Sequence, residues 1–155
     1  TKGPLWASLL SVSVFAPLFE EWLCRGLVLR GLMNKMNPAG AILTSAAFFA
    51  VLHMNPWQAL PAFILGALFG YVYYRTGSLK LTMLMHCVNN TLSVIVSRIP
   101  AFEDVEFFAE VMSPWAYVLV VLAFAAVLAS GLVIMRSIPL KESNLGGCDA
   151  IDSSF

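Results

Sequence analysis

Charged residues are scarce in this sequence: they make up 12% of its 155 residues, whereas hydrophobic residues make up 59%. Soluble domains usually have about a quarter of their residues charged, so this composition and a mean hydropathy of +0.81 exclude an ordinary soluble domain. Nine basic and nine acidic residues cancel, which leaves no basic field for a nucleic acid partner. The composition predicts an integral membrane protein surrounded by lipid.

Cysteine and histidine are also rare. Cys24, Cys87 and Cys148 are an odd number with no paired spacing, which argues against a disulfide framework and against a thiolate zinc site. His53 and His86 are the two histidines of the chain. The sequence lacks an initiator Met and the cleavage pattern of a signal peptide, so we expect it to be part of a longer protein.

Five apolar runs, separated by short polar or Pro/Gly breaks, predict an all-α polytopic membrane helix bundle. The expected helices span residues 5–33, 39–53, 57–74, 81–97 and 114–135. The first is longer than the ~20 residues that cross a ~30 Å hydrocarbon core, so we expect it to tilt, to protrude or to kink after Pro17. Gly66 and Gly70 lie one turn apart and would allow close packing of the third helix.

We expect residues 1–140 to form the membrane core and residues 141–155 to form a polar, disordered tail. The acidic segment 98–113 is expected to be a solvated loop. Basic residues gather at one set of predicted helix ends: Arg30, Lys35, Arg75, Lys80, Arg136 and Lys141. The opposite ends carry Lys2 and Arg98. By the positive-inside rule, the C-terminus is expected to be cytoplasmic.

Two adjacent carboxylates and an arginine interrupt the first apolar helix. Placing each of Glu20, Glu21 and Arg25 in hydrocarbon would cost about 2.5 to 3.5 kcal/mol. Such costly residues are not expected in a helix that only anchors a protein in the membrane. Glu21 and Arg25 are one turn apart, so they are predicted to form an ion pair. Glu20 points about 100° away and has no local partner. An ionisable group at such a depth indicates a functional site.

Three further polar residues lie at a similar depth in the bilayer. His53 ends the second predicted helix, and His86 and Asn90 share one face of the fourth. At 1.5 Å per residue, Glu20 and His53 lie roughly 22 Å, and Asn90 roughly 18 Å, from the basic ends of their helices. A single His or Asn in a membrane helix more often bonds a neighbouring helix, and Glu21 and Arg25 more often form a structural ion pair than take part in chemistry. Convergence of three helices on one layer instead favours a site.

These residue types fit the activation of a water molecule for amide hydrolysis. A carboxylate held out of water is a stronger base, so Glu20 could take the proton, and His53 could share it or pass it to a leaving amine. His86 and Asn90 could donate N–H groups to a developing oxyanion. A zinc site made by Glu20, His53 and His86 is the alternative. Because no His-Glu-x-x-His pair is present, we favour the mechanism without a cofactor.

Three motifs give a family resemblance: EExxxR from Glu20 to Arg25, FxxxH from Phe49 to His53, and HxxxN from His86 to Asn90. The motifs lie in this order on successive predicted membrane helices. In this respect the chain resembles the CPBP intramembrane proteases, also called Abi, which include the type II CAAX prenyl endopeptidases. The resemblance covers residues 15–95 and implies a fold of about eight helices, of which this chain would be the last five. It also implies that Glu20 and His53 activate the water.

The resemblance assigns the oxyanion hole to His86 and Asn90, and supporting roles to Glu21 and Arg25. The family has been described both as zinc-dependent and as glutamate-based. It implies a peptide or protein substrate, either lipidated or a bacteriocin precursor. Two other functions stay open: a non-catalytic immunity or scaffold protein of the same fold, and a proton-relaying transporter. The lack of an inverted repeat or a second charged cluster counts against the transporter.

Overall fold

The computed structural model describes residues 3–99, 113–137 and 139, and this part of the chain contains helices and no strands. One continuous helix, residues 5–33, is built from α1 (Leu5–Ser8), η1 (Leu9–Phe15), α2 (Ala16–Glu21), η2 (Trp22–Leu29) and α3 (Arg30–Met33). It is followed by α4 (Pro38–Leu52), α5 (Pro56–Thr76), α6 (Leu79–Val96) and α7 (Pro114–Ser137). The all-α fold is confirmed. Every predicted boundary lies within two residues of the observed one.

The expected polar tail, with Lys141 and Cys148, lies outside the described residues, as do Lys2 and residues 100–112 of the expected acidic loop.

Local sequence features explain where two of the described helices start. Asn37 caps α4 by accepting the backbone N–H of Gly40 at 2.7 Å, and Pro38 fits the first helical position because it has no N–H to lose. Ser78 caps α6 through the N–H of Leu81.

The first helix, which was expected to tilt, to protrude or to kink after Pro17, is not a regular α-helix. The segments η1 and η2 are π-helical, with α2 between them. Pro17 lies at the start of α2, where a proline in a regular helix would remove an i→i−4 hydrogen bond and clash with the preceding turn. Widening of the preceding turn accommodates the ring, so the helix continues through Pro17.

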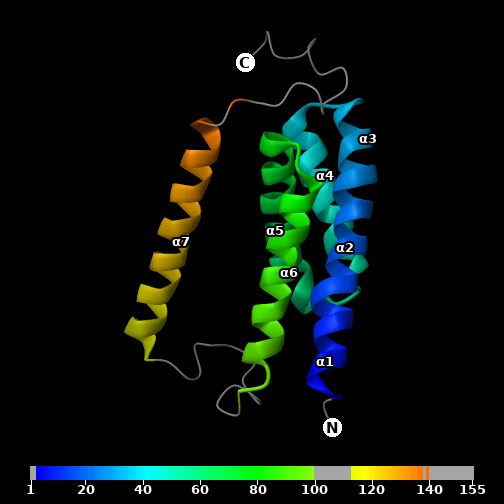
Figure 1. Ribbon diagram of the computed structural model, residues 1–155. Helices are drawn as coiled ribbons and strands as arrows, with labels where there is room; N and C mark the ends of the chain where they lie inside the picture. The colour runs from blue at the N-terminus through cyan, green and yellow to red at the C-terminus, as the bar shows by residue number, and fades with distance from the viewer. Residues whose placement is uncertain (1–2, 100–112, 138, 140–155) are drawn as a thin grey trace.

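Figure 1 shows the first helix, α4, α5 and α6 as a bundle with roughly parallel axes, and α7 standing to one side. The first helix packs on α6 through η1 and α2, and on α4 through η2. α4 and α5 form the most extensive helix pair. The ends of α3, α5 and α7 and the start of α6 lie at one end of the bundle, where Arg75 donates to the carbonyl of Arg136 at 2.8 Å. That this end is cytoplasmic stays a prediction.

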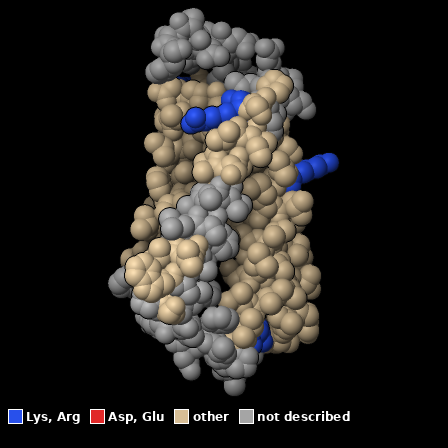
Figure 2. Space-filling model, turned by 90° about the vertical axis from the view of Figure 1, so that its left-hand side faces the viewer, with Lys and Arg blue, Asp and Glu red and all other residues tan. Residues whose placement is uncertain are grey.

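The protein is a membrane helix bundle with two small apolar clusters in its described core. One comprises Leu29, Met33, Ala41 and Tyr73, and the other comprises Cys24, Phe49, Ala50 and Ala62. Within the described residues, two helices are long and apolar enough to cross a membrane: Leu5–Met33 and Leu79–Val96. On the face in Figure 2, the visible Lys and Arg atoms lie toward the two ends, and the described residues between them are uncharged. Such an uncharged surface suits the hydrocarbon layer.

The predicted close packing at Gly66 is confirmed by the space around it. A Cβ on Gly66 would lie 3.1 Å from the Ala46 Cα and 3.2 Å from a ring carbon of Phe49. We expect Gly66→Ala to lower the free energy of unfolding by about 1 to 3 kcal/mol, because backbone blocks the new methyl group. The control is Gly31→Ala, since a Cβ there meets nothing within 4 Å. Thermal unfolding in detergent measures both; equal stabilities would contradict the expected clash.

Candidate active site

The centre of the bundle holds a fully buried ion pair. Arg25 Nη1 donates to Glu21 Oε1 at 2.8 Å, and neither side chain has any exposed surface. The pair predicted from the one-turn spacing is thus confirmed. Arg25 Nη2 also donates to the Gly66 carbonyl of α5 at 2.8 Å. The guanidinium lies over the rings of Phe49 and Phe69, with Cζ at 4.9 and 5.6 Å from the ring centres. These contacts fix the first helix against α4 and α5.

His86 joins the two adjacent carboxylates of the first helix. Its Nδ1 lies 2.9 Å from Glu21 Oε1, and its Nε2 lies 3.7 Å from Glu20 Oε2. Since the carboxylate of Glu21 accepts, Nδ1 carries a proton, and Nε2 faces Glu20. Glu20 has no partner on its own helix, as expected, but α6 supplies one. Its side chain is 26% exposed, whereas that of Glu21 is fully buried.

The four ionisable groups balance when His86 is protonated. Two carboxylates, Glu20 and Glu21, then face one guanidinium, Arg25, and one imidazolium, His86, so their charges sum to zero. A neutral cluster is far cheaper to bury than a charged one, because each charge has a partner in place of water. The buried Glu21–Arg25 pair therefore accounts for how this helix can hold one of the two glutamates in its core, while Glu20 remains partly exposed at the cavity.

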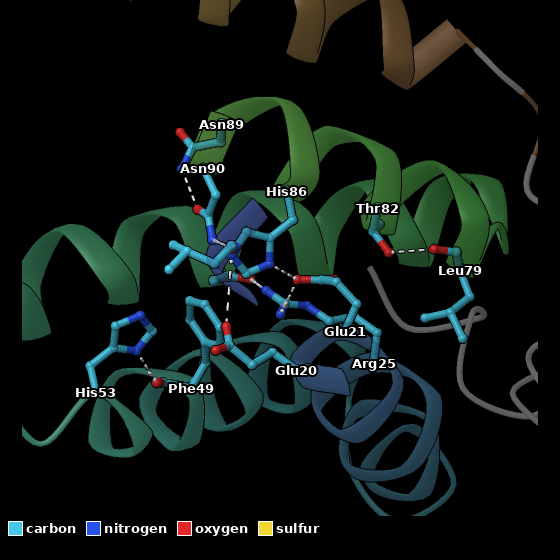
Figure 3. A network of polar contacts seen from close by, with 12 residues as sticks. Glu20, Glu21, Arg25, Phe49, His53, Leu79, Thr82, His86, Asn89 and Asn90 are labelled. Atoms are coloured by element: carbon cyan, nitrogen blue, oxygen red, sulfur yellow. Dashed lines mark hydrogen bonds and ion pairs between the residues drawn. The ribbon is translucent and has the colours of Figure 1, made fainter. Parts of the chain in front are cut away.

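His53 lies at the C-cap of α4, just after the last helical residue. Its Nδ1 donates to the Phe49 carbonyl at 3.0 Å, because a carbonyl oxygen only accepts. The other ring nitrogen, Nε2, is left to accept or give a proton. The Phe49 ring packs edge-on against both imidazoles, with centres 4.8 Å from His53 and 5.6 Å from His86. Figure 3 shows this ring between the two histidines.

Asn90 is held by two hydrogen bonds. Its Nδ2 donates to the Val12 carbonyl of η1 at 2.9 Å, and its Oδ1 accepts from Asn89 Nδ2 at 3.2 Å. Together these bonds fix which end of the amide is nitrogen. An amide nitrogen has two N–H groups, so one N–H of Asn90 remains for another acceptor.

A cavity of about 460 Å³ lies among these residues, a size in the range of small-ligand sites. It is lined by the four residues predicted to do the chemistry, Glu20, His53, His86 and Asn90. They come from the first helix, the end of α4 and α6, and Figure 3 shows them around one space. Apolar walls are supplied by α5, which contributes Pro61, Ala62, Leu65 and Phe69. The shared depth estimated from the sequence thus corresponds to a shared cavity.

The pairing of residues within the site differs in one respect from the expected one. Sequence reasoning placed His53 beside Glu20, whereas within the described residues the ion-pair partner of Glu20 is His86. Phe69, Gln58 and Asn89 also line the cavity and were not among the predicted site residues. Phe69 had a local signal, because it lies three residues after Gly66 and therefore on the same face of α5.

The placement of the side chains does not fit the zinc alternative. Among the residues that the structure describes, no three His, Cys, Asp or Glu side chains gather closely enough to hold a metal ion. Glu20 and His86 approach each other, but His53 lies across the Phe49 ring from His86. The choice between the two mechanisms stays a prediction for chelation to test.

Comparisons with known proteins agree with the motifs. The family model for "Type II CAAX prenyl endopeptidase Rce1-like" matches residues 2–92, which include every predicted site residue. The Bacillus subtilis protein named "Putative membrane peptidase YdiL" is 28% identical over 88 residues, 57% of this chain and 36% of that protein. The chain therefore spans about a third of the length of this relative. No solved structure matches this chain.

Proposed function

Because this chain belongs to the Rce1-like family of type II CAAX prenyl endopeptidases, we propose that it carries the active site of an intramembrane endopeptidase. The observation that supports this most is the cavity, where Glu20, His53, His86 and Asn90 meet although they lie on three separate helices. The substrate is a peptide bond in a protein segment that reaches the cavity from the membrane. A lipidated protein and a bacteriocin precursor are both substrates of this kind.

In the proposed reaction, Glu20 and His53 activate a water molecule. A Glu20 oxygen takes one proton from the water, while the water oxygen bonds to the carbonyl carbon of the peptide. The C–N bond then breaks, and the proton passes to the leaving amine. His53 suits this transfer, because its Nδ1 is held by the Phe49 carbonyl and its Nε2 is available. The products are an acid and an amine, with the atoms of water divided between them.

His86 and Asn90 are proposed to stabilise the oxyanion. Protonated His86 has an N–H at Nε2 besides the Nδ1–H given to Glu21, and Asn90 has its second amide N–H. Donors fixed in advance are effective because they need no reorganisation as the negative charge develops. Glu21 and Arg25 then support the site: Glu21 orients the imidazole, and Arg25 neutralises Glu21.

Metal dependence separates the two chemical versions of this proposal. We expect the purified full-length protein in detergent to cleave a membrane peptide substrate, to contain no stoichiometric zinc by elemental analysis, and to keep its activity after exhaustive chelation. The reason is that no three ligand side chains are gathered at the site in the described part. Loss of activity on chelation and its return with added zinc would overturn the metal-free version.

The competing reading is a non-catalytic membrane scaffold or immunity protein of the same fold. The buried Glu21–Arg25 pair alone would suit a scaffold, because such a pair specifies helix contacts. A cavity with a partly exposed carboxylate is less expected of a scaffold, since filling it would stabilise the bundle. Absence of cleavage with all tested membrane peptides, together with full folding, would favour the scaffold.

A further inference from the structure

The carbonyl of Val12 is left without a partner inside its own helix. In the π-helical segment η1 each carbonyl accepts from the residue five positions ahead, and Ala16 N–H accordingly donates to Ser11. The next bond in this pattern would run from residue 17 to Val12. Residue 17 is proline, which has no N–H. The residue that an α-helix would use instead, Ala16, already donates to Ser11.

Asn90 supplies the hydrogen bond to the Val12 carbonyl that Pro17 cannot donate. Its Nδ2 donates to the Val12 carbonyl at 2.9 Å, across 78 positions of sequence. Asn89 holds the other end of the same amide, through Asn90 Oδ1. With these two bonds made, the amide plane is fixed, and the second N–H is the polar group of Asn90 that remains for a ligand in the cavity.

We propose that Pro17 is a positioning residue: by withholding an N–H from Val12, it leaves that carbonyl to hold the Asn90 amide in the orientation that serves the oxyanion. The role in the oxyanion rests on the proposed function, whereas the hydrogen bond itself does not. Pro17 is buried and is not among the residues that line the cavity. It therefore acts through Val12 and Asn90, not by contact with the substrate.

The energetic logic is that of an unsatisfied backbone group. A helix carbonyl that lacks a donor within its own helix gains from an outside donor, so Val12 and Asn90, which both line the cavity, stabilise each other. An alanine at position 17 would restore a backbone N–H to this turn, so Val12 could be bonded within its own helix, by residue 17 in a π-turn or by Ala16 in an α-turn. Asn90 would then compete with a backbone donor for the Val12 carbonyl and would be held less firmly.

Two double-mutant cycles test this, with Pro17→Ala and Asn90→Ala alone and together in the full-length protein. In the first cycle the readout is thermal stability in detergent, which needs no enzymatic activity. We expect coupling: Asn90→Ala destabilises the wild type but has a smaller effect when Pro17 is alanine. Pro38→Ala is the control, because Pro38 begins α4 at the other end of the bundle and should not couple to Asn90. Additive effects of Pro17→Ala and Asn90→Ala would overturn the proposal.

The second cycle measures kcat and KM separately. Pro17→Ala should lower kcat roughly ten- to a hundred-fold with little change in KM, because the oxyanion donor is misplaced. In the Asn90→Ala background, itself slower by about 10²- to 10³-fold, it should have no further effect on kcat. An equal fall in both backgrounds, or no fall at all, would overturn the positioning role.

The two readouts keep this proposal separate from the proposed function. If the wild type shows no cleavage, the protease assignment fails, while the stability cycle still decides whether Pro17 holds Asn90. If Pro17→Ala does not fold, wild-type protein with isotope-labelled asparagine gives the answer by nuclear magnetic resonance. One Asn90 side-chain proton should then exchange slowly with solvent and the other fast. Two equivalent, fast-exchanging protons would overturn the proposal.

Discussion

Glu20→Gln is expected to lower kcat for peptide cleavage by about 10²- to 10⁴-fold, because a neutral amide cannot take the proton from water. Folding should be nearly unchanged. The Glu20 side chain is 26% exposed and its partner, His86 Nε2, lies at 3.7 Å, which is longer than a hydrogen bond. An assay of the full-length protein with saturating substrate measures kcat, and thermal unfolding of the same sample measures stability.

His53→Ala provides a second test of the same step. It should lower kcat in a comparable range, because the proton on Glu20 would lose its route to the leaving amine. A small amine such as imidazole, added to the assay, should partly restore the rate by filling the vacated space. Cleavage at the wild-type rate by Glu20→Gln would rule out Glu20 as the base. A parallel loss of stability and activity in both variants would instead favour the scaffold.

The fold was predictable because its signals are local. Apolar runs, proline and glycine breaks and capping residues such as Asn37 and Ser78 set the helix ends, and no distant residue had to be known. The Glu21–Arg25 pair was predictable for the same reason, since residues one turn apart on a helix are neighbours. The two π-helical segments were missed, because hydrophobic periodicity barely distinguishes an α-turn from a π-turn.

The sequence predicted the depth of the candidate site residues in the membrane, but not which of their side chains touch one another. Counting residues along each helix gives depth in the membrane, and depth correctly placed Glu20, His53 and Asn90 around one cavity. Rotation of the helices about their axes decides which side chains touch, and rotation depends on packing. Depth therefore could not reveal that His86, and not His53, faces Glu20, nor that the Phe49 ring separates the histidines.

The neighbouring change, Glu21→Gln, is expected to have the opposite profile to Glu20→Gln. It should lower the free energy of unfolding by about 3 to 5 kcal/mol, because it leaves Arg25 as an uncompensated buried charge. The loss is expected to be large for a second reason as well: Glu21 Oε1 accepts from both Arg25 and His86. Thermal or denaturant unfolding in detergent, with Glu20→Gln as the matched control, measures the difference between the two adjacent glutamates.

A double variant separates loss of charge balance from loss of shape. Arg25→Met in the Glu21→Gln background removes the stranded cation and keeps an apolar chain against Phe49 and Phe69, so part of the lost stability should return. Activity should not return with it, since a neutral amide oxygen at position 21 holds the His86 imidazole less firmly than a carboxylate does. Equal stability of Glu21→Gln and Glu20→Gln would mean that the buried pair does not hold the bundle together. The two adjacent glutamates would then have the same role, whereas in the structure Glu21 is buried in an ion pair and Glu20 lines the cavity.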